Sequence, residues 1–332
     1  MTKKMAYPIT FFAGLIFLAG IFALSILIGA KDISPIDVWR AITFSSTSED
    51  ILVLQEIRIP REVGAMLVGA AFGVSGAVMQ GVTRNPLADP GLLGLTSGAT
   101  AALAITLAFS PGLGYIGTMI ACFVGAAVGS VLVIGLSAAK KGKLSPLRIV
   151  LAGAAISAFL IALTEGVSIY FEESKNVSMW TAGGLIGTTW KQLALVYPFI
   201  GIGILIAVIF SKQLTILSLS EEVAVGLGQK LTQVRAVLFL AVILLTGASV
   251  ALIGNLAFVG LMIPHLVRWI TGTDYRFIVP MSAVIGAAYM VVADTAGRMI
   301  NAPYETPIVA VVAILGLPFF LFIVHRGGKG IS

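Results

Sequence analysis

Charged residues are scarce in this sequence of 332 residues: Asp, Glu, Lys and Arg make up 11% of it, whereas hydrophobic residues make up 58%. A soluble domain of this length needs charged side chains over its whole surface, because water has to solvate that surface. Here the charges are clustered between long uncharged runs. The pattern excludes a soluble globular protein and predicts an all-α, polytopic membrane protein.

Residues that carry catalytic or metal chemistry are scarce too. His265 and His325 lie far apart in the chain, and the single cysteine, Cys122, lies inside an apolar run, where it cannot form an intrachain disulfide. No His, Cys or acidic residues have the spacing of a metal site, and no nucleophile stands at readable spacing from a base. The sequence also lacks a G-x-x-x-x-G-K-[ST] phosphate loop. We therefore predict no metal, no cofactor and no enzymatic activity.

What the sequence does contain is a series of long apolar runs. All but the eighth have the roughly 20 apolar residues that a membrane-spanning helix needs. The eighth is short and contains Pro264, so a re-entrant segment there would reduce the count of about ten transmembrane helices to nine. The predicted spans are residues 5–30, 63–83, 92–109, 114–138, 147–170, 192–211, 232–253, 257–270, 277–299 and 306–324.

Lys and Arg are distributed unequally between the two sides of these spans. Cytoplasmic loops collect Lys and Arg, and most of the 21 lie on the side that carries both termini. Both termini are therefore predicted to be cytoplasmic, and the net charge of +6 needs no nucleic acid to explain it. The first apolar run exceeds a signal-peptide core and is predicted to be retained. The minority side holds Lys31, Arg40, Arg58, Arg61, Lys175, Lys191 and Arg298.

A polar stretch, LSLSEEVAVGLGQK at residues 217–230, separates the sixth and seventh spans. Ser218 and Glu221 have the spacing of a capping box, which predicts the start of a short helix. Three apolar residues fall on one side of that helix, and two glycines can end it. About eight helical residues are unstable alone in water, so the helix needs a surface: a membrane, its own bundle or another protein. The residues are Val223, Ala224 and Leu227, followed by Gly226 and Gly228.

Small residues recur every four positions along the second span, which predicts close packing of another helix against it. After this span, the stretch TRNPLADPGLLG at residues 83–94 predicts a rigid turn, because its prolines prevent a helix and its glycines let the chain re-enter the bilayer. Arg84 and Asp89 can pair across this turn. The stripe consists of Gly69, Gly73, Ala77 and Gly81, with Gly125 and Gly129 in a second one; the turn contains Asn85, Pro86, Pro90, Gly91 and Gly94.

Carboxylates within the predicted spans are few. Glu165 lies near the outer end of the fifth span, and Asp294 lies four residues before Arg298 in the ninth, which allows an ion pair within the helix. Acids in these positions also occur in proton-coupled secondary transporters, so that class remains a rival.

Long motifs in this chain resemble the permease subunits of ABC importers for iron–siderophore complexes, haem and vitamin B12. They appear in order over essentially the whole chain: RIPR (58–61), VGAAFGVSGAVMQGVTRNPLADPGLLG (68–94), SEEVAVGLG (220–228), FVGLMIPHLVR (258–268), AD with Arg298 (293–298) and ETPIVAVVAILGLPFFLFIVHR (305–326). The resemblance implies the type II ABC importer permease fold, a single transmembrane domain over residues 1–332 of about ten helices.

The resemblance also implies partners and sites. A second permease, identical or related, completes one pathway in the cell membrane; two cytoplasmic ATPase subunits and an extracytoplasmic substrate-binding protein complete the importer. The inner loop 212–230 is implied to couple to the ATPase, the three outer arginines to dock the binding protein, and the turn to be structural or to contribute to the ATPase contact or inner gate. The residues concerned are Ser220, Glu221, Glu222, Val223, Ala224, Gly226, Leu227 and Gly228 for coupling; Arg58, Arg61 and Arg298 for docking; and Arg84, Asn85, Pro86, Asp89, Pro90 and Gly91 for the turn.

The function that follows is import of iron(III)–siderophore complexes by alternating access, driven by a partner ATPase. Because the chain lacks a ligand cluster, the chelate has to cross intact, and haem or cobalamin would satisfy that condition equally. Candidate pathway residues are Glu165, Pro264 and His265, although such a histidine is more often a packing residue. A purely structural membrane scaffold is the remaining alternative.

Overall fold

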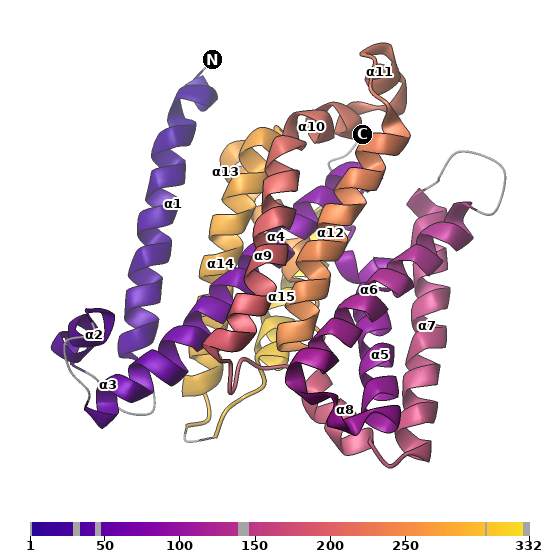
Figure 1. The fold of residues 1–332 in the computed structure, drawn as a ribbon. Helices are drawn as coiled ribbons and strands as arrows, with labels where there is room; N and C mark the ends of the chain where they lie inside the picture. Colours follow the sequence, from indigo (N-terminus) through magenta and orange to yellow (C-terminus); the bar gives the residue numbers. More distant parts are fainter. Residues whose placement is uncertain (1, 29–33, 44–47, 139–145, 303, 328–332) are drawn as a thin grey trace.

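The computed structural model describes residues 2–28, 34–43, 48–138, 146–302 and 304–327, which form a bundle of helices (Figure 1). Lys31, Lys140, Lys141, Lys143 and Lys329 of the charge count lie outside these residues. The helices are α1 Thr2–Leu27, α2 Pro35–Ile42, α3 Glu49–Val53, α4 Ile59–Thr83, α5 Leu95–Phe109, α6 Gly114–Ala138, α7 Pro146–Tyr170, α8 Ser174–Thr181, α9 Trp190–Ile209, α10 Ser211–Leu219, α11 Glu221–Gly226, α12 Leu231–Ile253, α13 Val259–Thr271, α14 Tyr275–Met299 and α15 Ile308–Gly327.

Each predicted span contains a helix, but the lengths differ from those expected. In the described part of the chain, seven helices are long and apolar enough to cross a membrane alone, and shorter apolar helices occupy 95–109, 259–271 and 308–321. We predicted that only the eighth span would be short; α5 is short as well. Its first turn is delayed because Pro90 opens a tight 3₁₀ turn, Pro90–Leu93, that occupies the start of the predicted span.

Helix α4 lies at the centre of the bundle and contacts α12, α13 and α14. The predicted stripe of small residues packs against α14: a Cβ atom added to Gly69 would lie 2.1 Å from the carbonyl oxygen of Gly286. A second close crossing involves a glycine outside that stripe, because a Cβ on Gly76 would lie 1.8 Å from the carbonyl oxygen of Gly260 in α13. In a membrane, such backbone contacts provide the dense packing that holds helices together.

The two ends of the bundle differ in what they carry (Figure 1). At one end, α10 and α11 connect α9 to α12; we call this the α11 end, and α1 begins and α15 ends there. At the opposite end, the α8 end, lie α2, α3, α8 and the connection from α14 to α15. Helices α1, α7 and α9 expose most of their apolar residues, as a lipid-facing surface requires, whereas α4, α12 and α14 are mostly buried.

Candidate functional site: two ion clusters and a polar cavity

The residue that caps the start of helix α11 is Ser220 and not the predicted Ser218. The Ser220 backbone is extended, and its hydroxyl oxygen accepts a hydrogen bond from the Val223 amide at 3.1 Å. Ser218 instead donates its hydroxyl to the Thr215 carbonyl at 2.7 Å, because α10 continues to Leu219 and includes it. The helix has six residues, fewer than we predicted, and Gly228 follows it with a φ of +77°.

The apolar residues of α11 do not share one buried face. Ala224 is fully buried, whereas the side chains of Val223 and Leu227 are exposed, contrary to the predicted common face. A six-residue helix makes fewer than two turns, so few of its side chains can face the bundle, and here Ala224 does. The result is an exposed apolar surface at the tip of the molecule, which we call the α11 patch. It consists of Leu219, Val223, Val225 and Leu227.

Glu221 faces the interior of its own subunit. Its Oε1 lies 2.6 Å from Nη2 of Arg235 in α12 and 3.1 Å from Nη2 of Arg84, which follows α4. We predicted that Arg84 can pair with Asp89; this was wrong, because Arg84, which ends α4 in a left-handed conformation, pairs with Glu221. These three residues form the inner ion cluster, which connects α4, α11 and α12. Glu222, in contrast, is exposed.

The turn after α4 is built by side chains that satisfy its backbone. Asn85 Oδ1 accepts a hydrogen bond from the Leu87 amide at 3.0 Å, and Asp89 Oδ1 accepts one from the Gly91 amide at 2.8 Å. The other oxygen of Asp89, Oδ2, is buried without a hydrogen-bond partner. Burial raises the pKa of Asp89 to about 6, and the Gly91 amide opposes that rise. Burial thus disfavours the ionised form of this carboxyl group, and the Gly91 amide favours it.

Asp89 forms part of the lining of a polar cavity of about 450 Å³. The cavity lies between α5, α7, α8 and the extended segment 255–257, and Glu165 of α7 lines it as well. The chain thus brings together two acids that lie far apart in the sequence. Seven of the lining residues are Ser or Thr, and one is Asn255; Lys, Arg and His do not occur among the described residues that line it.

Pro264 and His265, the other pathway candidates, lie elsewhere. Pro264 is buried inside α13, and neither residue lines the polar cavity. The His265 ring packs edge-on against Trp269 and Phe319, with ring centroids 5.5 and 6.1 Å apart. This environment is that of a packing residue, the interpretation that sequence statistics favour.

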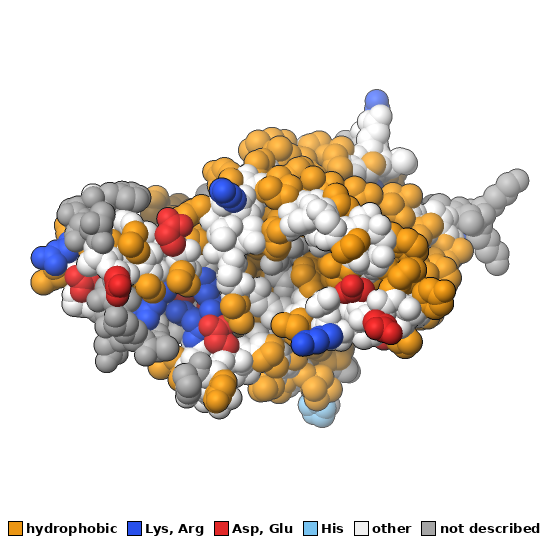
Figure 2. Space-filling view, turned by 60° about the horizontal axis from the view of Figure 1, so that its bottom comes forward, with side chains coloured by type: hydrophobic (Ala, Val, Ile, Leu, Met, Phe, Trp, Pro, Cys, Tyr) orange, Lys and Arg blue, Asp and Glu red, His pale blue; other side chains and the backbone are white. Residues whose placement is uncertain are grey.

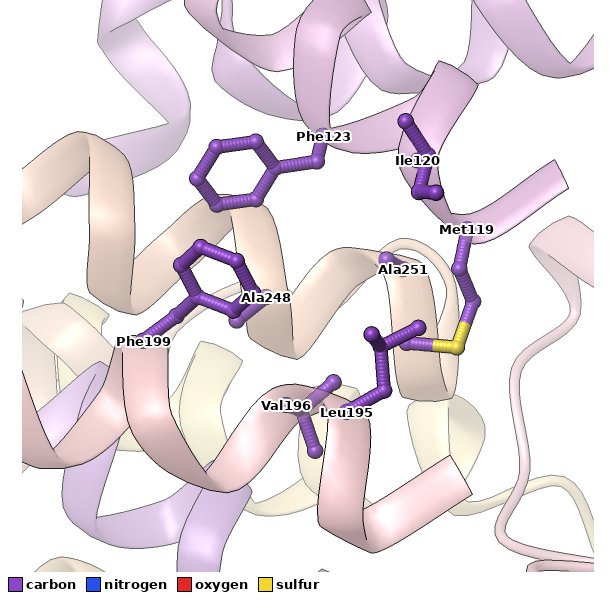
Figure 3. Close-up of a pocket in the computed structure, with 8 residues that line it drawn as sticks. All are labelled: Met119, Ile120, Phe123, Leu195, Val196, Phe199, Ala248 and Ala251. Carbon is purple, nitrogen blue, oxygen red and sulfur yellow. The ribbon is translucent and has the colours of Figure 1, made fainter. Parts of the chain in front are cut away.

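A second cavity, which is apolar and has a volume of about 290 Å³, lies between α6, α9 and α12 (Figure 3). The rings of Phe123 and Phe199 face each other across one side of it, with centroids 5.0 Å apart, and Met119 lies at the other end. No charged or hydrogen-bonding side chain is among its described lining residues. The cavity is therefore unsuited to a hydrated ion or a polar chelate.

At the α8 end, Lys and Arg side chains lie close to Asp and Glu side chains on the surface of the molecule (Figure 2). Arg61 donates to both oxygens of Asp294, with Nε–Oδ2 at 2.8 Å and Nη2–Oδ1 at 2.9 Å, and its Nη1 lies 2.8 Å from Glu305 Oε1. Arg298 pairs with Glu62, and its Nε lies 3.2 Å from Asp294 Oδ2, so the predicted ion pair within the ninth span is present. We call these five residues the outer ion cluster.

The three arginines predicted to dock a partner are all engaged within the subunit. Arg58 is buried and donates to the Ile26 carbonyl oxygen at 2.9 Å, while Arg61 and Arg298 belong to the outer ion cluster. Sequence reasoning missed Glu62, because the predicted span began at Val63. Helix α4 actually begins at Ile59, which places Glu62 in its first turn and buries it completely. The acidic residue directly after the RIPR motif was the sequence feature that could have indicated Glu62 as part of this cluster.

Replacing Asp294 with alanine is expected to destabilise the protein strongly. The side chain is 1% exposed and neutralises Arg61 and Arg298, which are 11% and 9% exposed. Its removal breaks the bidentate pair with Arg61 and the ion pair with Arg298 in a poorly solvated site, at a cost of roughly 3 kcal/mol. Glu305 and Glu62 remain as the partners of the two arginines. Thermal unfolding of the purified protein in detergent measures this loss. The control is Arg40→Ala, which breaks an exposed pair with Asp37 and should cost less than ~1 kcal/mol; equal losses in both variants would contradict the prediction.

Comparisons with known proteins agree on one family. The profile of the FecCD transport family matches residues 15–326. The iron(3+)-hydroxamate import system permease protein FhuB of Bacillus subtilis (strain 168) is 41% identical over 309 residues, which cover 93% of this chain and 80% of that protein. The ferric enterobactin transport system permease protein FepD of Escherichia coli (strain K12) is 36% identical over 312 residues, covering 93% and 92%.

A solved structure shares the fold over nearly the entire chain. It is described as an inward-facing conformation of a metal-chelate type ABC transporter, and it superposes with a TM-score of 0.83 at 27% sequence identity. The superposition covers 96% of this chain and 99% of that chain. The arrangement of helices in Figure 1 is therefore that of a transporter subunit.

Proposed function

The chain belongs to the FecCD transport family of ABC transporter permeases, and from this premise we propose that it forms part of the membrane pathway of an importer for iron(III)–siderophore complexes. It is a multi-pass membrane subunit without catalytic activity of its own. Its relatives named for hydroxamate and enterobactin carry iron enclosed in an organic chelate. A shared cargo of that kind supports the same class of substrate here.

The observation that carries the proposal is the polar cavity within an otherwise apolar bundle. In the described part of the chain, no group of three or more His, Cys, Asp and Glu residues could hold a metal ion. Iron therefore has to cross inside its chelate, and the cavity has to accommodate the chelate's outer surface. Hydroxyl groups and an amide suit the oxygen-rich surface of a siderophore better than the mainly hydrocarbon ring of haem.

We propose that the α11 end faces the cytoplasm, where the excess of Lys and Arg belongs, and that the α11 patch docks on one of two ATPase subunits. A short helix in a groove buries apolar side chains that water would otherwise surround. The inner ion cluster then transmits the motion. Glu221 holds Arg84 at one end of the turn, and Asp89 near its other end lines the cavity. Displacement of α11 on ATP binding thus reaches the cavity through residues 84–94.

At the α8 end we propose that a substrate-binding protein docks, and that a second permease, identical or related, completes the pathway. Among the three predicted docking arginines, Arg61 has the most accessible partner, because the Glu305 side chain is 35% exposed. An acidic residue of the binding protein could replace Glu305 there. Arg58 and Arg298 have more deeply buried partners and hold the helices that present Arg61.

Transport in purified vesicles tests the function. The permease, its ATPase and its binding protein are reconstituted in proteoliposomes, and uptake of ⁵⁵Fe-labelled siderophore is measured. We expect uptake that requires ATP and the ATPase and that a proton ionophore leaves unchanged. Uptake that persists without the ATPase and collapses with the ionophore would instead establish the rival class, a proton-coupled transporter that uses Glu165 and Asp294.

A further inference from the structure

We infer that the polar cavity selects its cargo by charge, and that it admits neutral and cationic chelates while disfavouring anionic ones. The inference rests on the proposed function, and it names a substrate class within it. Three singly charged hydroxamates balance the charge of iron(III), so such chelates are neutral, or cationic when they carry an ammonium group. Three doubly charged catecholates leave their iron complex strongly anionic.

The charged side chains that line the cavity are all acidic among the described residues. Asp89 and Glu165 are its acidic lining residues, and the described lining residues include no base. The arginines nearest in the sequence to the turn and to its packing partners contact other residues: Arg84 pairs with Glu221, and Arg268 donates a hydrogen bond to the Gln80 side-chain oxygen. A cation inside the cavity therefore meets two acidic side chains, while an anion meets no basic side chain among the described lining residues.

Asp89 is held in place by backbone groups, one of which favours its charged form against the effect of burial. Its Oδ1 accepts from the Gly91 amide, while the buried Oδ2 has no hydrogen-bond partner. The carboxyl group lies against the first turn of α13: a Cβ atom added to Gly260 would be 3.2 Å from Oδ2. The positive end of the α13 dipole favours a carboxylate there and so opposes the effect of burial.

The neutral part of the cavity lining is rich in Ser and Thr side chains. The hydroxyl groups on α5, α7 and α8 both donate and accept hydrogen bonds, as the pair between Ser97 and Ser157 at 3.2 Å illustrates. Ser97, Thr100, Thr164 and Thr181 donate to carbonyl oxygens of the chain and can accept from the cargo. The Asn255 amide, in contrast, can donate to amide and hydroxamate oxygens. Weak neutral contacts together with a negative field describe a passage for hydroxamate-type chelates.

Charge-selective labelling of an introduced cysteine tests the field directly. In a Cys122→Ala background, Ser157→Cys places a thiol on the cavity wall, and Ser110→Cys places one in the exposed turn between α5 and α6. The permease–ATPase complex in vesicles reacts with a trimethylammonium-ethyl or a sulfonatoethyl methanethiosulfonate. Each reagent transfers its thioalkyl group to the thiolate as a mixed disulfide and releases methanesulfinate.

We expect the ratio of cationic to anionic labelling rates at Ser157→Cys to exceed that at Ser110→Cys by about tenfold, which is the effect of roughly one unit charge in a partly solvated site. Adding Glu165→Lys should remove most of this difference, whereas Glu172→Lys, on an exposed residue outside the described lining, should not change it. Equal ratios at the two cysteines would overturn the inference. So would an unreactive thiol at Ser157 together with one at Thr100→Cys, because the cavity would then be closed to water.

A second arm follows cargo. Ferrioxamine B carries a terminal ammonium, and its N-acetyl and N-succinyl derivatives make the same iron chelate neutral or anionic. Initial uptake rates, each measured at saturation of the binding protein, should fall from the cationic to the anionic chelate, and Glu165→Lys should remove most of that difference. An importer that moves all three equally would contradict charge selection and leave the proposed function standing. A charge-selective cavity in a chain that imports no chelate would contradict the proposed function alone.

Discussion

Replacing Val225 and Leu227 with aspartate is expected to abolish association of the permease with its ATPase and, with it, ATP-driven uptake. Both side chains belong to the α11 patch and are 59% and 64% exposed. Their substitution therefore leaves the bundle's own packing intact. In the docked complex, however, each aspartate would be buried in an apolar groove without a counter-charge. Removing one well-buried interface residue costs roughly 2–4 kcal/mol, and burying a charge adds to that.

Two such substitutions would weaken the complex by more than about a thousandfold, below the level at which the ATPase co-purifies. The measurement is pull-down of the ATPase by the solubilised permease, alongside size-exclusion chromatography to verify the permease itself. Val225→Ile with Leu227→Met keeps the patch apolar and serves as the matched control. Retention of the ATPase by the aspartate variant would show that α11 is not the docking element. Glu221 is unsuitable for this test, because its loss would break the inner ion cluster.

The second large effect is expected from Gly76→Val, which should prevent the bundle from assembling. A Cβ at this position would lie 1.8 Å from the carbonyl oxygen and 2.4 Å from the carbonyl carbon of Gly260. These are backbone atoms of α13, so no side-chain rotation can relieve the clash and the two helices have to separate. Overpacking at sites that can relax costs about 1–3 kcal/mol, and this site cannot relax. The loss is comparable with the whole stability of a typical domain.

The yield of monodisperse protein in detergent and its unfolding temperature measure the effect. Gly135→Val is the matched control, because it introduces the same β-branched residue into helix α6, where a new Cβ meets no atom within 4 Å. We expect the control to be obtained in normal yield and the Gly76 variant to aggregate or be degraded. A Gly76→Val protein as stable as the control would mean that α4 and α13 cross at a greater distance than the structure shows.

Local sequence patterns predicted the helices well but their partners poorly. The apolar runs placed a helix in every predicted span, and the break at Gly254 and Asn255 separates α12 from α13. The four-residue stripe correctly indicated close packing, because the period of a helix determines which residues share a face. Gly76 lies off that stripe. This position has to be glycine because α13 crosses α4 so closely there, and the local sequence does not encode the direction of that crossing.

Ion pairing shows the same division. The pair between Asp294 and Arg298 follows from helical spacing and was predictable. The pairing of Arg84 with Glu221 joins residues on separate elements, so sequence proximity to Asp89 gave the wrong partner.

By itself, the sequence determined that this protein spans the membrane as a helical bundle and which family's motifs it carries. Those properties depend on composition, on periodicity and on motifs read along the chain. Only the tertiary structure decided that Arg58, Arg61 and Arg298 are engaged within the subunit, that α11 exposes its valines and Leu227, and that Asp89 and Glu165 line one cavity. The physical reason is that side-chain partners are selected by distance in space, which is set when helices pack.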